Sequence, residues 1–216
     1  MSCLSAHFFA RVQAAPFYQS LHEEAVALLP AGQGQRWLDL GCGPGLLSRL
    51  AHRHGYCVTG VDADPAMVRM AQRLVRRVGP TGLEFRVGRL GDPDRSVGRA
   101  DVVSAASLLA VMPDRSQAVR DLTALLRPGG TLLLIEPSAL MSPQSVRQYL
   151  AGQPRMPDAW VLRLWASTRK PARLVQASDL SAPGFVLTRH ALLGGLVNAW
   201  LLREIAPASG SAEAAI

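Results

Sequence analysis

The sequence predicts an α/β fold of the doubly wound type, in which helices cover both faces of a parallel sheet. Short apolar segments alternate with helical patterns over most of its 216 residues. The segment WLDLGCGPGLL, Trp37–Leu47, has the pattern of a strand that ends in a glycine-rich turn before a helix. Strands buried on both faces are nearly continuous apolar runs, and their crossover connections are usually helices. The length and the alternation together predict one globular domain.

The region before the first strand is predicted to be helical. Apolar residues recur there at intervals of three and four from about Ala6 to Leu29, and Pro16 interrupts the pattern. This spacing indicates two short amphipathic helices. A further helix is expected after the glycine-rich turn, from Leu46 to about His52.

The alternation then repeats along the chain. The expected strands are Cys57–Val61, Leu83–Val87, Asp101–Ala105 and Thr131–Ile135. One helix is expected to follow Pro65, because proline is favoured in the first turn of a helix. Another is expected over Gln117–Leu126, closed by a turn at the sequence RPGG, residues 127–130.

The pattern changes after residue 137. Ser142–Lys170 is predicted to be helical and is rich in Met, Trp and Arg, and a short helix is expected near Ala177–Leu180. Two strands, Phe185–Leu193 and Leu196–Arg203, are separated by two glycines at a hairpin-type junction. The small and polar residues of 207–216 are typical of a flexible terminus.

These elements predict a single domain over residues 1–206. Its expected parts are an N-terminal helical cap over 1–34, a core over 35–137, a helical insert over 138–182 and the last two strands over 183–204. The insert carries large side chains at Tyr149, Met156, Trp160 and Trp165. This composition suits a lid over a flat apolar molecule and, equally, helices that pack on the sheet.

Composition narrows the compartment and the partners. The net charge of +7 suggests nucleic acid or an acidic ligand, but Lys170 is the only lysine, and an excess made almost wholly of arginine is weak support. The N-terminus lacks the features of a signal peptide. The longest apolar run is broken by glycines and Asn198, well short of the roughly 20 residues of a membrane helix. The protein is therefore expected to be soluble and cytoplasmic.

The cysteines and carboxylates give no sign of a metal site. Cys3, Cys42 and Cys57 form an odd set without metal-like spacing, which argues against a disulfide framework and against structural zinc. The sequence shows no clear acidic cluster of the kind that a catalytic Mg²⁺ would use. No metal is expected.

The glycine-rich turn predicts a cofactor site. A strand, a glycine turn and a helix present backbone N–H groups at the carboxyl edge of a sheet, and both dinucleotides and S-adenosylmethionine use this arrangement. The dinucleotide pattern Gly-x-Gly-x-x-Gly would require a glycine where Leu46 stands. Asp39, two residues before the first glycine, would repel phosphate and attract an ammonium group. Asp62, at the end of the second strand, can accept hydrogen bonds from ribose hydroxyls and suits either cofactor.

Five segments carry a resemblance to a known family. They are LDLGCGPG (38–45), GVDADPAMV (60–68), FRVG (85–88), ADVVSAASLLAVMPD (100–114) and LLRPGGTLLLIEP (125–137). In this order they resemble class I S-adenosylmethionine-dependent methyltransferases. The resemblance implies a Rossmann-like seven-stranded sheet with helices on both faces, which ends in an antiparallel strand hairpin. It also implies S-adenosylmethionine as the cofactor.

The resemblance assigns the methionine end of that cofactor to the glycine-rich turn. Asp39 and Gly41 should face the methionine portion, above a floor formed by the backbone of Cys42, Gly43 and Gly45. Ala105 and Ala106 should lie near the sulfonium, at the end of the fourth strand.

The resemblance assigns the nucleoside end to the next two strands. Asp62 should bind the ribose hydroxyls, and Ala63 and Met67 should flank the adenine, although Met67 suits core packing equally well. The segment Gly88, Arg89 and Leu90 should lie beside the adenine. Many family members have an acid where Arg89 stands. An arginine cannot accept a hydrogen bond from the adenine amino group, so Asp92 or the backbone would have to do so.

The expected reaction is an in-line displacement at the sulfonium methyl group. Alignment and exclusion of water can carry much of this chemistry, and a general base is needed only when the acceptor arrives protonated. Four residues are candidates for that base: His7, Tyr18, His22 and Glu136. The remaining histidines, His52, His54 and His190, suit surface or core positions better.

Three functions compete at this point. The first is a methyltransferase that acts on oxygen, nitrogen or carbon of a small molecule. The second is an RNA methyltransferase, suggested by the charge and by Arg69, Arg73, Arg76 and Arg77, although no appended RNA-binding domain is evident. The third is a non-catalytic cofactor-binding or partner subunit, supported by Arg89 alone. The first is favoured, nucleic acid is not expected as a partner, and a homodimer is kept as an option.

Overall fold

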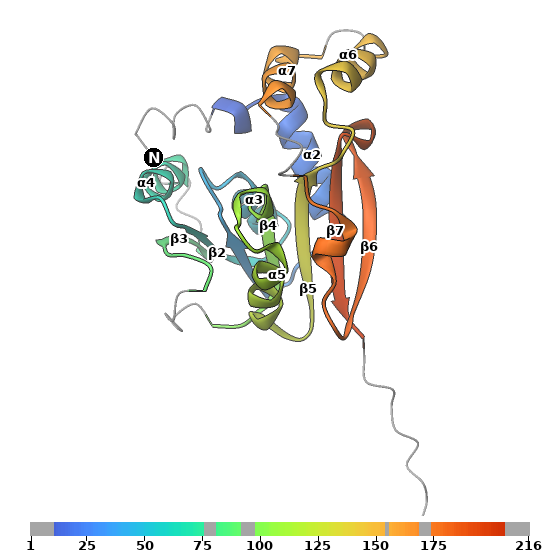
Figure 1. Cartoon of the computed structure of the whole chain (residues 1–216). Helices are drawn as coiled ribbons and strands as arrows, with labels where there is room; N and C mark the ends of the chain where they lie inside the picture. Colours follow the sequence, from blue (N-terminus) through green and yellow to red (C-terminus); the bar gives the residue numbers. More distant parts are fainter. Residues whose placement is uncertain (1–10, 76–80, 92–97, 154–155, 169–173, 206–216) are drawn as a thin grey trace, which may run out of the picture.

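A seven-stranded mixed sheet forms the centre of the protein (Figure 1). The computed structural model describes residues 11–75, 81–91, 98–153, 156–168 and 174–205. The strands are β1 Arg36–Leu40, β2 Cys57–Asp62, β3 Leu83–Val87, β4 Ala100–Ala106, β5 Leu126–Pro137, β6 Phe185–Leu192 and β7 Val197–Glu204. They lie in the order β3-β2-β1-β4-β5-β7-β6. The predicted doubly wound α/β fold is confirmed.

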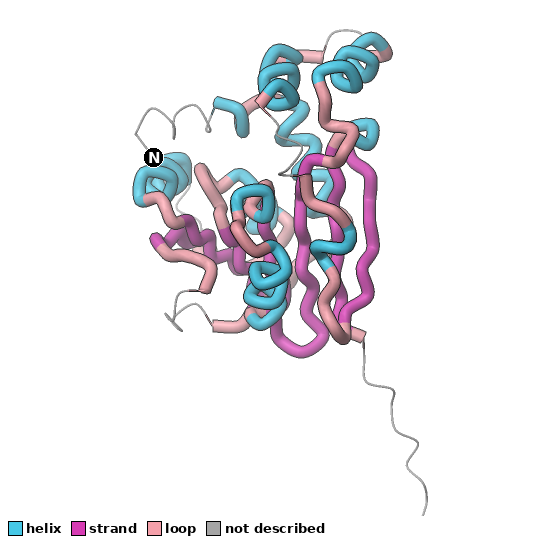
Figure 2. The backbone as a smooth tube through the Cα atoms, in the orientation of Figure 1, coloured by secondary structure: helices cyan, strands magenta, loops and turns pink. Residues whose placement is uncertain are grey.

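Helices lie on both faces of this sheet and beyond its carboxyl edge (Figures 1 and 2). They are α2 Pro16–Val26, α3 Leu46–Arg53, α4 Pro65–Val75, α5 Arg115–Ala124, α6 Pro143–Ala151 and α7 Ala159–Ser167. Short 3₁₀ turns are η2 Leu109–Val111, η4 Ala177–Leu180 and η5 Leu193–Gly195. Figure 1 shows α6 and α7 grouped with α2 at the end of the sheet where β5 leaves it.

The strand order reverses next to β1. The chain runs outward from β1 to β2 and β3, then returns to place β4 on the other side of β1, and all of these pairs are parallel. β5 adds parallel to β4, whereas β7 pairs antiparallel with both β5 and β6. The crevice beyond the carboxyl ends of β1 and β4 is therefore a topological switch point, where open α/β sheets commonly bind ligands.

The two faces of the sheet carry separate cores. Trp37 in β1 and Leu133 in β5 belong to a core with residues of α2 and α3. Leu38, which follows Trp37, and Leu132, which precedes Leu133, belong instead to a core with residues of α5. This alternation is the period of two that a strand imposes, and it explains why the strands are apolar at nearly every position.

One close approach fixes how α3 and β2 meet β3. The aromatic ring of Phe85 fills the space that a side chain would need at Gly45 and at Gly60. A Cβ atom built on either glycine would lie 2.6 Å from that ring. Glycine at these two positions therefore allows the glycine-rich turn to rest on the sheet.

The helix expected over Gln117–Leu126 has different bounds. α5 begins earlier because the carboxylate of Asp114 accepts a hydrogen bond of 2.8 Å from the backbone N–H of Gln117. It ends at Ala124, since Leu126 already pairs with Ala100. The register shifts before the next pair, Val102 with Thr131, so the sequence RPGG lies in an irregular part of β5. The expected turn after the helix was therefore wrong.

The insert and the N-terminal region follow their sequence patterns in part. The helical prediction for Ser142–Lys170 resolves into α6 and α7, because the first helix ends at Gly152 and the second starts after Asp158, which has a positive φ of 56°. α2 begins at Pro16, which confirms the predicted break there. Within the described ranges, no helix has the length and apolar character that a membrane crossing requires.

The contact between Gly60 and Phe85 gives a test of the packing. Gly60→Ala should lower the free energy of unfolding by about 1–3 kcal/mol, because a methyl group would overlap the Phe85 ring and the Ser48 hydroxyl. Gly152→Ala is the matched control, since its Cβ would meet nothing closer than 3.7 Å. Urea unfolding should place the control within about 0.5 kcal/mol of the parent. Equal stability of both variants would contradict this account of the packing.

Candidate active site

A cavity of about 550 Å³ lies at the switch point of the sheet. Four strand ends contribute to it: Leu40 with Gly41, Gly43 and Pro44 after β1; Val61, Asp62 and Ala63 at β2; Gly88, Arg89 and Leu90 after β3; and Ala106 with Ser107, Leu108, Val111, Met112 and Pro113 after β4. Gln13, Tyr18 and Met67 complete the lining. This volume and mostly apolar lining, with a few convergent polar groups, are typical of small-molecule sites.

The glycine-rich turn is held to the end of β2. Gly41, Gly43 and Gly45 all have positive φ, at 69°, 53° and 79°. The N–H groups of Gly41 and Cys42 donate to the carbonyl of Val61 at 2.8 and 3.0 Å. The N–H of Gly43 donates to Oδ2 of Asp62 at 2.8 Å. Only glycine adopts such a succession of left-handed conformations without strain, which explains its density here.

Asp62 joins the turn to the cavity. Its Oδ2 binds Gly43 N–H, and its Oδ1 accepts a hydrogen bond of 2.8 Å from the N–H of Asp64. An ionised carboxylate has about four lone-pair sites, so each oxygen can accept a further hydrogen bond. Because Asp62 lines the cavity, it can offer those sites to a ligand hydroxyl.

Asp39 lies beneath the turn and does not line the cavity. It is 1% exposed, and its two oxygens accept hydrogen bonds from the hydroxyls of Ser48 at 2.6 Å and Ser104 at 2.8 Å. Ser104 in turn accepts from the indole N–H of Trp37. Burial raises the pKa of Asp39 to about 6, although the serine hydrogen bonds oppose this shift. Asp39 thus lies behind the turn, and its contact with the methionine portion of a cofactor stays a prediction.

Three further predicted residues also lie behind the cavity surface. Gly45 faces the Phe85 ring, and Ala105 is fully buried in the sheet. The thiol of Cys42 is buried, and burial together with the charges of Asp39 and Asp62 raises its pKa well above the usual range. A protonated and buried thiol is not a nucleophile.

The residues expected near the adenine gather in one part of the cavity. Ala63, Gly88, Arg89 and Leu90 line it, as does Met67 from α4. Met67 is only 2% exposed, so it belongs to the packed interior and to the cavity surface at once. The two sequence interpretations of this methionine are therefore compatible.

Sequence reasoning missed two parts of the lining. The first is the segment after β4, of which Ser107, Leu108, Val111, Met112 and Pro113 line the cavity. The second is Gln13, whose side-chain oxygen accepts a hydrogen bond of 3.1 Å from the N–H of Leu46 at the start of α3. No local signal marks Gln13, because its role depends on how the N-terminal region crosses the glycine-rich turn.

Only one of the four base candidates is seen at the cavity surface among the described residues. Tyr18 lines the cavity, and its ring packs against those of His22 and Trp165, with centroids at 4.4 and 5.4 Å. His22 is buried away from the cavity and donates from Nδ1 to the carbonyl of Tyr18 at 2.8 Å. Burial lowers the pKa of His22 to about 4, so the ring is neutral at pH 7. His7 lies outside the described residues.

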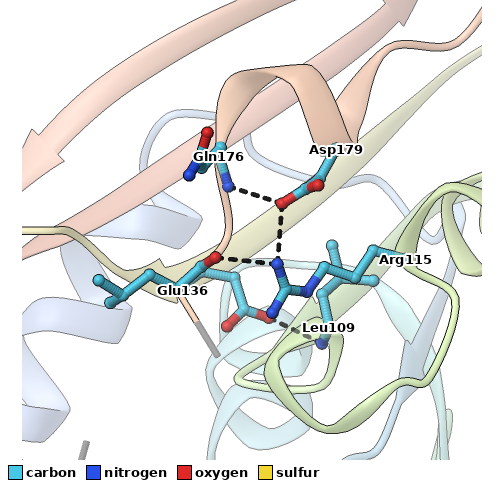
Figure 3. A network of polar contacts seen from close by, with 6 residues as sticks. Leu109, Arg115, Glu136, Gln176 and Asp179 are labelled. Atoms are coloured by element: carbon cyan, nitrogen blue, oxygen red, sulfur yellow. Dashed lines mark hydrogen bonds and ion pairs between the residues drawn. The ribbon is translucent and has the colours of Figure 1, made fainter. Parts of the chain in front are cut away.

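Glu136 is also placed away from the cavity surface. It is 1% exposed at the end of β5, and its Oε1 accepts a hydrogen bond of 2.9 Å from the N–H of Leu109 (Figure 3). It is not among the lining residues, so the expectation of a general base is corrected to a buried acceptor.

The large side chains of the insert divide between two surroundings. Trp165 packs on Tyr18 and so approaches the cavity. Tyr149 and Met156 line a different cavity, together with Phe17 and Leu21 of α2, and Trp160 is exposed. Among the residues described, no group of three or more His, Cys, Asp or Glu is arranged to hold a metal ion.

Comparison with known proteins places this cavity in a family context. Residues 38–134 match the model of a methyltransferase domain. A ubiquinone biosynthesis O-methyltransferase from Xanthomonas campestris is 38% identical over 110 residues, which are 50% of this chain and 46% of that protein. One from Coxiella burnetii is 30% identical over 100 residues, 46% of this chain and 42% of that protein. The chain therefore spans about half the length of the relatives that it matches.

Solved structures share the fold over most of the chain. The magnesium protoporphyrin IX methyltransferase of Synechocystis, with bound S-adenosylhomocysteine, superposes with a TM-score of 0.63 at 19% identity, covering 91% of this chain and 93% of that one. An O-methyltransferase family 2 protein from Planctomyces limnophilus, in complex with apigenin, gives 0.65 at 19% identity, covering 93% and 62%. At 19% sequence identity, these superpositions show a shared fold and nothing more.

The buried carboxyl of Asp39 predicts a pH dependence of stability. Its folded pKa of about 6 lies above the ordinary 3.8, so protonation stabilises the fold below about pH 4, and that stabilisation is lost as pH rises through about 6. Between about pH 4 and pH 7 the parent should lose roughly 2–3 kcal/mol more than Asp39→Asn, which cannot titrate. His22 acts in the opposite direction in both proteins, so its effect cancels. Urea unfolding across this range measures the difference, and identical pH profiles would contradict the prediction.

Proposed function

We propose that this protein, whose residues 38–134 match the model of a methyltransferase domain, is a class I methyltransferase that transfers a methyl group from S-adenosylmethionine to a small molecule. The acceptor atom would be oxygen, nitrogen or carbon. The observation that carries the proposal is the cavity at the switch point, which combines the glycine-rich turn, the carboxylate of Asp62 and an apolar slot.

The donor set of the cavity fits the proposed cofactor. The remaining lone pairs of Asp62 suit the two hydroxyls of a ribose. Ala63, Met67 and Leu90 offer apolar surface for a flat base. Arg89 lines the same region and supplies no acceptor, so recognition of the adenine amino group would fall to the backbone or to Asp92, which lies outside the described residues.

Alignment is the main contribution that the chain can make to the reaction. When bound, the cofactor supplies the methyl group and a neutral thioether leaving group. The Leu108 side chain lies against Gly41, since a Cβ on this glycine would be 3.1 Å from it, and both residues line the cavity at the ends of β1 and β4. Val111, Met112 and Pro113 extend an apolar surface that excludes water.

Among the described residues, Tyr18 is the one base candidate that lines the cavity. Two neighbouring rings, His22 and Trp165, fix its orientation at the cavity. If the acceptor arrives with a proton on its nucleophilic atom, Tyr18 would be the residue to take it among the described candidates, because it alone of them lines the cavity. His22 would act through Tyr18 and does not contact the acceptor.

Small-molecule acceptors are favoured over RNA by the relatives. By their names, the matched proteins act in ubiquinone biosynthesis, and phenolic acceptors are therefore the first to screen. An RNA methyltransferase would instead show salt-sensitive RNA binding. The cytoplasmic location, the homodimer and the single-domain division with its cap and lid remain predictions.

Titration with S-adenosylhomocysteine tests the proposal. The parent should bind this product with micromolar affinity and should not bind NAD. Asp62→Ala should weaken binding by about tenfold or more, because it removes the ribose acceptor and one bond of the glycine-rich turn. Asp62→Asn retains an oxygen for Gly43 and should lose less.

Asp101→Ala is the matched control for this titration. Asp101 accepts a hydrogen bond from the backbone N–H of Arg36 and pairs with Arg127, at the amino ends of the parallel strands and so at the opposite edge of the sheet. The affinity of the Asp101→Ala variant for S-adenosylhomocysteine should stay within about twofold of that of the parent. A parent that does not bind the product would refute the proposed function and favour the partner-subunit interpretation.

A further inference from the structure

One wall of the cavity is formed by the segment that follows β4. This post-β4 wall, Ser107–Pro113, contributes five lining residues and contains only the short turn η2. Ser107 has a φ of 55°, a left-handed conformation that costs energy for a residue with a side chain. Such a segment keeps its position only where the surrounding structure determines it.

The end of β5 holds this wall at two successive residues. The carbonyl of Ile135 accepts a hydrogen bond of 2.8 Å from the N–H of Ser107. The next residue, Glu136, accepts from the N–H of Leu109 through its side chain at 2.9 Å. Figure 3 shows the Glu136 carboxylate directed from β5 toward Leu109. One strand end thus fixes the entry to the wall by a carbonyl and its turn by a carboxylate.

Burial of the Glu136 side chain carries a desolvation cost. Glu136 is 1% exposed, and Leu109, which it contacts, is fully buried in the core between β5 and α5. An apolar residue at position 136 would avoid the desolvation cost of a carboxylate, but it would leave a buried N–H without this acceptor. The contribution of this buried carboxyl group to the structure is therefore that it accepts the hydrogen bond from Leu109.

The far end of the wall is tied to a separate element. Arg115, at the start of α5, donates from Nη1 to the carbonyl of Leu174 at 2.9 Å and to Oδ2 of Asp179 at 3.0 Å. The same Asp179 oxygen accepts from the N–H of Gln176 (Figure 3). The wall is therefore bonded to β5 through Glu136, and Arg115, two residues beyond its end, is bonded to the segment that contains η4.

We propose that Glu136 is a positioning residue, which holds the post-β4 wall in the shape that binds the cofactor and aligns the acceptor. The inference rests on the proposed function. Glu136 acts through Leu109 on the neighbouring wall residue Leu108, which lines the cavity and lies against Gly41 of the glycine-rich turn. A substitution that removes the hydrogen-bond acceptor at position 136 frees the wall. A substitution that retains an acceptor oxygen there keeps the wall in place.

The test compares Glu136→Ala with Glu136→Gln, whose amide oxygen can accept the same hydrogen bond. Leu202→Ala is the control, because Leu202 is fully buried in β7 and is not a cavity residue. Calorimetric titration with S-adenosylhomocysteine should show affinity lost by about tenfold in Glu136→Ala and by at most about threefold in Glu136→Gln. Leu202→Ala should lower the melting temperature without changing affinity.

Hydrogen exchange of the amides of residues 107–112 is the second readout, and it does not depend on any ligand. Exchange in this segment should accelerate in Glu136→Ala and stay near the parent rate in Glu136→Gln and Leu202→Ala. Unchanged exchange and affinity in Glu136→Ala would overturn the inference, as would a Gln variant as impaired as the Ala variant. A parent that fails to bind the product would refute the proposed function, while exchange would still decide whether Glu136 fixes the wall.

Discussion

The hydrogen bond from the N–H of Gly43 to the carboxylate of Asp62 is the constraint on which the rest of the site depends. It joins the turn after β1 to the end of β2, two strands that are neighbours in the sheet. The paired bonds to the carbonyl of Val61 reinforce this junction. Because the same carboxylate lines the cavity, the group that shapes the turn is also the group that a ligand hydroxyl would meet. Shape and recognition are coupled at one side chain.

Three carboxyl groups converge on the carboxyl edge of the sheet, each with a different kind of partner. Asp39 accepts from hydroxyls beneath the turn, Asp62 from main-chain N–H groups beside the cavity, and Glu136 from a main-chain N–H behind the post-β4 wall. Of the three, only Asp62 lines the cavity, and Arg89 lines it as well. The carboxyl groups of Asp39 and Glu136 therefore support the cavity from behind.

The parts of the site that the sequence predicted are those with a local cause. The glycines need positive φ, and Asp62 follows directly on an apolar strand, so both can be inferred from their neighbours in the chain. The orientation of Asp39 depends on Ser104, which reaches it only because β4 returns to lie beside β1. The end of α5 depends likewise on pairing between Leu126 and Ala100 across the sheet. Such long-range partners leave no periodic signal in the sequence.

The cofactor side and the acceptor side of the cavity come from different parts of the chain. The family match ends at residue 134, so it includes the glycine-rich turn, Asp62 and the post-β4 wall but stops before Glu136. It also leaves out α2, which brings Tyr18 to the cavity, and α7, whose Trp165 packs on Tyr18. Under the proposed function, the matched segment would hold the cofactor, whereas Tyr18, the candidate for contact with the acceptor, lies outside it. Acceptor specificity should therefore follow the packing of α2 and α7 around Tyr18, and the wall anchored by Glu136 is where the two sides meet.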